Sequence, residues 1–171
     1  MDYYSSEDRA EDAHRINRSE LPLAKKPAYL NERVIRAQMR RGRNAVDLSL
    51  IKWRIIRRAY RYISERPVPA KYYADLYPLL GYRSCALCLQ AFDRYSEAHG
   101  TIDDGSARCQ FCSLAAIDRC TGPGSTFGRI EGLLHSPAYV YTVPESKLKD
   151  ANERLGGLID TMIKNLMSLR S

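Results

Sequence analysis

Residues 44–66, "NAVDLSLIKWRIIRRAYRYISER", contain the strongest periodic pattern in the chain and decide its fold class. Asn44 is a typical helix N-cap, and Pro67 and Pro69 prevent the helix from continuing. At about 100° per residue the segment has an apolar and a basic face. The apolar face comprises Leu48, Ile51, Ile55, Ala59, Tyr62 and Ile63, and the basic face Arg54, Arg57, Arg58 and Arg61. The pattern predicts an amphipathic helix and a mainly α-helical fold.

A shorter helix is predicted just before it, over residues 31–42. Asn31 is its expected N-cap and Gly42 its C-terminal stop. Residues 31–66 hold eleven Lys or Arg against three Asp or Glu, a net charge of +8, while the whole chain has +7. The helical pair therefore carries the entire positive excess, which favours an anionic partner.

Nucleic acid, DNA or RNA, is the partner that the arginines favour, because guanidinium groups bind phosphate oxygens strongly. The expected contact residues are Arg36, Arg40, Arg41, Arg43, Lys52, Arg54, Arg57, Arg58 and Arg61. Trp53 and Tyr60, at one flank of the helix, are candidates for stacking on bases. Two alternatives stay open: the basic side is an ordinary solvated face, or it docks an acidic protein as an adaptor or inhibitor. A membrane surface is disfavoured, because the apolar face has the breadth of a core-facing helix.

Four cysteines form the pattern C-x2-C-x20-C-x2-C: Cys85, Cys88, Cys109 and Cys112. This spacing is typical of a structural zinc site, in which four thiolates surround one Zn2+. The alternatives are an iron–sulfur cluster, which also takes four thiolates, and cysteines that are merely buried. Cys120, eight residues beyond Cys112, is expected to be a core residue. The odd number of cysteines argues against a complete set of disulfides and for a reducing compartment.

The residues around these cysteines suggest how the site is built. His99-Gly100 and Asp103-Asp104-Gly105 are turn signals, which predict a hairpin between the cysteine pairs, and residues 112–120 are predicted to form a helix. In this arrangement residues 81–122 resemble treble-clef zinc fingers. Neither Cys88 nor Cys112 is followed by the glycine that such fingers usually carry. Four thiolates would leave no open position for water, so the zinc is expected to be structural.

Catalysis is not expected from this sequence. Treble clefs also occur in HNH-type nucleases, but His99 is the only histidine near the cysteines, and no asparagine lies between Asn44 and Asn152. The segment "GPGSTFG", residues 122–128, lacks the Gly-Lys-Ser/Thr ending of a phosphate-binding loop. The chain is therefore interpreted as a non-enzymatic accessory or regulatory protein.

The C-terminal residues 145–171 are predicted to form a helix with one apolar seam. The seam comprises Leu148, Ala151, Leu155, Leu158, Met162, Leu166 and Leu169. Gly156 and Gly157 weaken the helix. The seam has two alternative uses, pairing with its copy in a homodimer or packing on the chain's own helices.

The predicted fold class is thus mainly α with a small α+β zinc finger. Its expected regions are a flexible arm (1–30), a basic helical region (31–80), a zinc module (81–122), a linker with a short strand at 138–143 (123–144) and a C-terminal helix (145–171). Residues 70–82 are expected to add a short helix. Because no apolar stretch is typical of a secretory signal or a membrane span, an intracellular protein of the cytoplasm or nucleus is expected.

Overall fold

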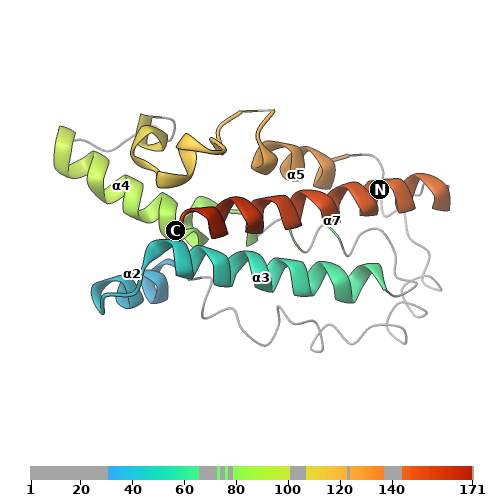
Figure 1. The fold of residues 1–171 in the computed structure, drawn as a ribbon, viewed down its shortest axis with the longest axis horizontal. Coiled ribbons are helices and arrows are strands. Elements are labelled where there is room, and N and C mark those ends of the chain that lie inside the picture. Colours follow the sequence, from blue (N-terminus) through green and yellow to red (C-terminus); the bar gives the residue numbers. More distant parts are fainter. Residues whose placement is uncertain are drawn as a thin grey trace, which may run out of the picture.

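The computed structural model describes residues 31–65, 73, 76, 79–100, 107–122, 124–136 and 144–170. In these residues every regular element is helical (Figure 1). The α-helices are α2 (Glu32–Arg40), α3 (Ala45–Ser64), α4 (Ala86–His99), α5 (Thr126–Leu134) and α7 (Glu145–Ser168). The 3-10 helices η4 (Tyr82–Ser84), η5 (Ala107–Phe111) and η6 (Ser113–Ala116) lie between them. The predicted arm, the predicted strand and most of the helix predicted over 70–82 lie outside the described residues.

Both predicted helices of the basic region are confirmed, together with their caps. Asn31 Oδ1 accepts a hydrogen bond from the Arg33 amide at 2.8 Å, and Asn44 Oδ1 accepts one from the Val46 amide at 2.7 Å. Each bond satisfies an amide that the first helical turn leaves without a partner. Gly42 then turns the chain between the helices with a φ of 83°, a value that favours glycine.

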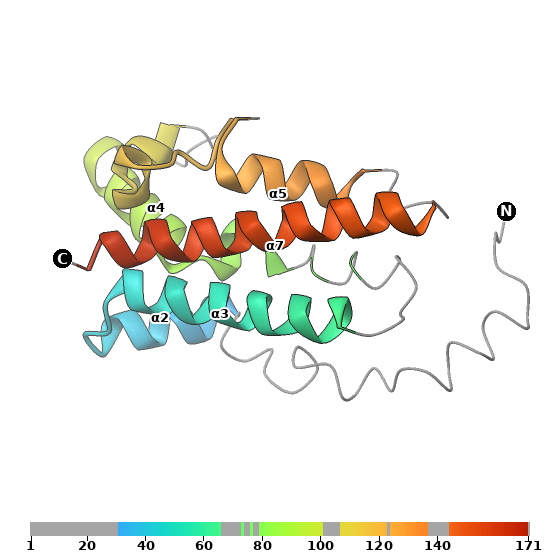
Figure 2. The same ribbon diagram turned by 45° about the vertical axis from the view of Figure 1, so that its right-hand side comes forward.

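The core lies between α3 and α7, which run side by side and share the most extensive contact in the molecule (Figures 1 and 2). On its other side α7 contacts α5, and α4 packs against α3 and α2 at one end of the bundle. One apolar cluster extends through all five helices, from Ile35 to Leu166. The described part of the chain therefore has one continuous hydrophobic core.

The buried side of α3 differs from the predicted apolar face. Leu50, Trp53 and Ile56 are almost fully buried, whereas Ile51 and Ile55 are only half-buried. Because α3 contacts α7 on one side and α4 on another, the arc it buries is wider than the predicted face and centred elsewhere. Leu48, Ala59 and Ile63 are buried as predicted.

The predicted C-terminal helix is confirmed, and its seam packs inside the chain. The seam residues that are buried against the common core are Ala151, Leu155, Leu158, Met162 and Leu166. Leu148 and Leu169 pack against the same core at either end. Of the two predicted uses of the seam, packing on the chain's own helices is the one seen here. No helix among the described residues is long and apolar enough to span a membrane.

The hairpin predicted between the cysteine pairs is wrong over residues 89–99, which belong to α4. Gly100 follows the helix with a φ of 64° and caps it, its amide donating to the Ser96 carbonyl. A glycine in this conformation suits a helix C-terminus as well as a turn, so the residue type alone does not distinguish the two. The helix predicted over 112–120 is also wrong, because only η6 forms there. The described part of residues 81–122 has no strand, so the treble-clef arrangement is not seen.

The glycine-rich segment 122–128, placed mostly in the predicted linker, contains the start of α5. Ser125 is the N-cap, and its Oγ accepts a hydrogen bond from the Gly128 amide at 2.9 Å. A Cβ on Gly128 would collide with the Gly122 carbonyl oxygen. These glycines therefore allow close backbone approach where the chain enters α5.

Candidate metal centre and nucleic-acid interface

The first cysteine pair lies at the N-terminus of α4. Cys85 is the N-cap residue, and Cys88 lies in the first turn. The preceding η4 turn is fixed by Ser84, whose Oγ contacts the carbonyl oxygens of Leu79 and Gly81 at 2.9 and 2.7 Å. Local hydrogen bonding thus presents both thiols on one side of a tight turn.

The second pair is held by the two short 3-10 helices. Cys109 lies in η5, Cys112 directly follows it, and the Cys112 amide donates to the Cys109 carbonyl at 3.2 Å. Because η5 packs extensively on α4, the two pairs approach each other although 20 residues separate them in the sequence.

The five cysteines line two adjoining cavities. Cys88, Cys109, Cys112 and Cys120 line the smaller, of about 20 Å³, which is enough for one particle the size of a water molecule or a metal ion. Cys85, Cys88, Cys109 and Cys120 line the larger, of about 120 Å³, which reaches the bundle core. All five are free cysteines. As the side chains lie, no three His, Cys, Asp or Glu in the described part of the chain are arranged to hold a metal ion.

Cys120 belongs to this cluster, although its spacing predicted a residue of the core alone. It does pack against the apolar core, but it also lines both cavities beside the predicted ligands. Asp118 fixes its segment: Oδ1 accepts from the Thr126 amide at 3.1 Å, and Oδ2 accepts from Asn165 Nδ2 at 3.1 Å. The sequence contains no spacing signal for this tertiary bridge between α5 and α7.

Helix α3 places two buried polar side chains against the first cysteine pair. Ser49 Oγ lies 3.8 Å from Cys85 Sγ and accepts a hydrogen bond from the Leu87 amide at 3.3 Å. One turn further, Lys52 Nζ donates to the carbonyl oxygens of Leu80 and Gly81, both at 3.2 Å. Lys52 is only 2% exposed, so its prediction as a nucleic-acid contact is wrong. Lys52 lies four residues after Leu48 and seven before Ala59, on the apolar side of α3, so its charge and not its helical position suggested the contact.

Burial and neighbouring thiols shift the pKa values around the cluster. Burial lowers the pKa of Lys52, and the charges of Cys85, Cys88 and Cys120 oppose that shift. A hydrogen bond from the Cys88 thiol lowers the pKa of Cys85, and the same bond raises the pKa of Cys88. Burial raises the pKa of Cys120 to about 12 and also raises that of Cys112. Without a metal, therefore, one thiol of the first pair ionises much more readily than its neighbour.

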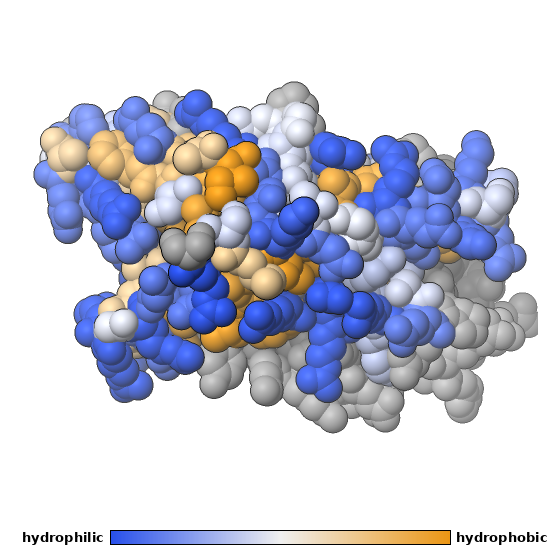
Figure 3. All heavy atoms as spheres, viewed as in Figure 1, coloured by the Kyte–Doolittle hydropathy of each residue, from blue (hydrophilic) through white to orange (hydrophobic). Residues whose placement is uncertain are grey.

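The remaining predicted contact arginines fall into two groups. Arg36 Nη1 contacts both carboxylate oxygens of Asp93 on α4 at 2.7 and 2.8 Å, and its Nε contacts Glu32 at 2.9 Å. Arg57 pairs with Asp160 on α7 at 3.0 Å. The second group is exposed and forms no ion pair with any described carboxylate: Arg40, Arg41, Arg43, Arg54, Arg58 and Arg61. Figure 3 shows hydrophilic residues along α2 and α3 on the face it views.

The aromatic residues proposed for base stacking are engaged in the core instead. Trp53 is 3% exposed, so its prediction as a stacking residue is wrong. The Tyr60 hydroxyl donates to the Asn152 carbonyl on α7 at 2.7 Å. An aromatic that does reach solvent is Tyr82, beside the cysteines, with the Arg108 guanidinium 4.4 Å from its ring centroid.

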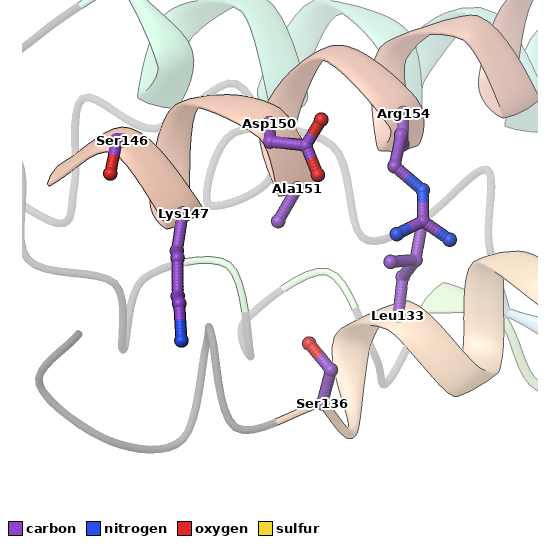
Figure 4. A pocket seen from close by; sticks show the side chains of 7 residues that line it. All are labelled: Leu133, Ser136, Ser146, Lys147, Asp150, Ala151 and Arg154. Atoms are coloured by element: carbon purple, nitrogen blue, oxygen red, sulfur yellow. The ribbon is translucent and has the colours of Figure 1, made fainter. Parts of the chain in front are cut away.

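A separate hollow lies where α5 ends and α7 begins (Figure 4). Lys147, Asp150 and Arg154 project into it from α7, and Leu133 and Ser136 come from the other side. These groups mix both signs of charge and include no nucleophile with an adjacent base. The hollow therefore defines no site by itself.

Comparison of the chain with protein-family models, curated proteins and solved structures finds no match.

Proposed function

We propose that this chain is a zinc-stabilised accessory or regulatory protein that binds nucleic acid through the arginines of α2 and α3 and performs no catalysis. The observation that carries the proposal is the group of six exposed arginines without carboxylate partners in the described residues. An arginine engaged in an ion pair has little left to offer a phosphate, whereas these six guanidinium groups are not committed to a carboxylate.

The spacing of three of these arginines supports a phosphate-binding surface. Arg54, Arg58 and Arg61 follow one another at four and three residues along α3, so they lie on the same side of the helix. Like charges at these spacings repel each other and destabilise an isolated helix. A polyanion along this row would relieve that repulsion, and it would release its condensed counterions on binding.

The metal part of the proposal assigns one Zn2+ to Cys85, Cys88, Cys109 and Cys112. Support comes from the ligand chemistry, because two C-x2-C pairs on contacting segments suit a thiolate-bound zinc. Three of the four cysteines, Cys88, Cys109 and Cys112, also line the cavity of ion size. The side chains would have to move for zinc to bind, because no three of them in the described residues are arranged for a metal as they lie. When bound, the zinc would tie η5 to the start of α4 and would thereby support the face of α3 that α4 covers.

The test of nucleic-acid binding is its dependence on salt. We expect the affinity for single- and double-stranded DNA and RNA to fall linearly in a plot of log K against log salt concentration. An affinity that is indifferent to salt would contradict phosphate contacts. A pull-down treated with nuclease separates the adaptor alternative: protein partners that persist after nucleic acid is destroyed would favour docking to an acidic protein instead.

The test of the metal is elemental analysis of freshly purified, reduced protein. We expect close to one zinc per chain. Iron in place of zinc would indicate an iron–sulfur centre, and the absence of any metal would contradict this part of the proposal.

A further inference from the structure

Lys52 is a buried lysine without a counter-charge among the described residues. Its side chain is 2% exposed, and it lies on the core side of α3 between Ser49 and Ile56. No described carboxylate forms an ion pair with it. Burying an ammonium group is strongly unfavourable unless an opposite charge is near, so the position requires an explanation.

The two carbonyl groups that Lys52 binds do not supply that charge. Leu80 and Gly81 each accept one hydrogen bond at 3.2 Å, whereas an ammonium group has three protons to donate. Carbonyl oxygens are also neutral acceptors, which satisfy hydrogen bonds without cancelling a charge. Both carbonyls belong to the turn that leads into Cys85, so the lysine is anchored beside the cysteine cluster.

The surroundings of Lys52 contain several thiols. It lines the larger cavity together with Cys85, Cys88, Cys109 and Cys120. Ser49, one turn before it on α3, contacts the Cys85 sulfur from the same helix face. The buried polar residues of α3 therefore both face the first cysteine pair.

We propose that Lys52 is the counter-charge of the metal centre and that it neutralises part of the negative charge of a zinc tetrathiolate. This inference depends on the zinc site proposed above. One Zn2+ with four thiolates has a double negative charge, and a fixed ammonium group at the edge of the cluster stabilises it without being a ligand. Lys52 is thus a positioning residue, which holds the turn before Cys85 and favours the thiolate form around the metal.

The test compares three substitutions in the full chain. Lys52→Gln keeps hydrogen-bond donors for the carbonyls but removes the charge, Lys52→Arg keeps the charge, and Lys52→Met removes both. Arg58→Gln, on the exposed side of the same helix, is the matched control for charge loss. Zinc affinity is measured by competition with a chelator, and circular dichroism checks that each metal-free variant keeps its helix content.

We expect Lys52→Gln and Lys52→Met to lower zinc affinity about tenfold or more, in the range known for groups that support metal ligands. Lys52→Arg should keep more of the affinity than Lys52→Gln, and Arg58→Gln should bind zinc like the wild type. If Lys52 only held the carbonyls, Lys52→Gln would be the better replacement. Wild-type affinity in Lys52→Gln would overturn the inference.

Cobalt gives a second readout that does not depend on the stability of the fold. Without a nearby cation the thiolates are easier to oxidise, so the sulfur-to-cobalt charge-transfer band of Lys52→Gln should move to longer wavelength. A band at the wild-type position in both Lys52→Gln and Lys52→Met would contradict the inference while leaving the zinc site intact. A wild-type chain that binds neither zinc nor cobalt would overturn the zinc proposal, and this inference with it.

Discussion

Gly156 of α7 lies directly beneath the Tyr60 ring of α3. A Cβ at this position would come 2.7 Å from the Tyr60 hydroxyl oxygen and 3.0 Å from the ring. That hydroxyl donates to the Asn152 carbonyl, one turn earlier on α7, at 2.7 Å. The glycine therefore lets α3 and α7, the two helices that share the most extensive contact, approach closely.

Replacement of Gly156 by alanine should destabilise the protein. Overpacking costs about 1–3 kcal/mol, which outweighs the roughly 1 kcal/mol that alanine gains in helix propensity. Gly157→Ala is the matched control, because a Cβ there has no atom within 4 Å, and it should raise the free energy of unfolding by up to about 1 kcal/mol. Urea unfolding of both variants measures the difference, and equal effects would show that the Tyr60 contact has no importance.

Loss of a zinc ligand should remove the metal and lower stability. Cys109→Ser should prevent binding and destabilise the region from Cys85 to Cys112, because zinc binding and folding are linked. Cys120→Ser should keep the metal and lose only packing. Elemental analysis and thermal unfolding of the two variants are the measurements.

A separate test concerns which cysteine is the fourth zinc ligand. Cys85 is the proposed ligand, but the small cavity is lined by Cys120 and not by Cys85. We expect Cys85→Ser to lose zinc. If Cys85→Ser kept a four-thiolate cobalt spectrum while Cys120→Ser lost it, the fourth ligand would be Cys120.

Removal of the arginine row on α3 should weaken nucleic-acid binding. The triple variant Arg54→Gln, Arg58→Gln and Arg61→Gln should bind less tightly, and its salt slope should fall by up to about three, about one for each phosphate group that is no longer bound. The control is Arg94→Gln, Arg119→Gln and Arg129→Gln, which removes the same charge from exposed positions outside α2 and α3. Equally weakened binding in both triple variants would indicate attraction by net charge alone.

Alkaline pH should destabilise the fold through Tyr73. Burial raises the pKa of this phenol well above its ordinary value of 10.0. The folded state therefore holds the proton more tightly, so the stability is complete below pH 10 and is lost as the pH rises above it. The free energy of unfolding should fall by at most about 1.4 kcal/mol per pH unit for this group.

Urea unfolding between pH 8 and 11 measures this slope. Tyr73→Phe should reduce it, after correction for the stability that the variant loses at pH 8. An unchanged alkaline slope in Tyr73→Phe would assign the effect to other groups.

The sequence was sufficient where structure depends on neighbouring residues. Asn31 and Asn44 cap α2 and α3 as predicted, because capping is a bond to the next few amides. The pattern of α7 also predicted its buried seam. The pattern did not show against which helix the seam packs, because packing in a homodimer and packing within the chain produce the same periodicity.

Predictions failed where distant segments decide the environment. The positive charge of Lys52 predicts a contact with nucleic acid, but the residue lies four residues after Leu48 and seven before Ala59, on the apolar side of α3, and is buried beside the turn before Cys85. The core position predicted for Cys120 is confirmed, but spacing did not show that Asp118 ties its segment to α5 and α7 beside the other cysteines. For Cys120 the deciding hydrogen bond joins segments far apart in the sequence, and no local pattern reports it.

The contact between α3 and α7 also has a consequence for biosynthesis. About 80 residues separate the end of α3 from the start of α7, so α3 leaves the ribosome several seconds before its main partner exists. During that interval α4 is available to cover part of its apolar surface, but the face that α7 covers stays open to water or chaperones. Closing so long a loop also slows folding. A nascent chain that stalls before residue 145 therefore exposes the apolar side of α3 and becomes a target for aggregation or proteolysis.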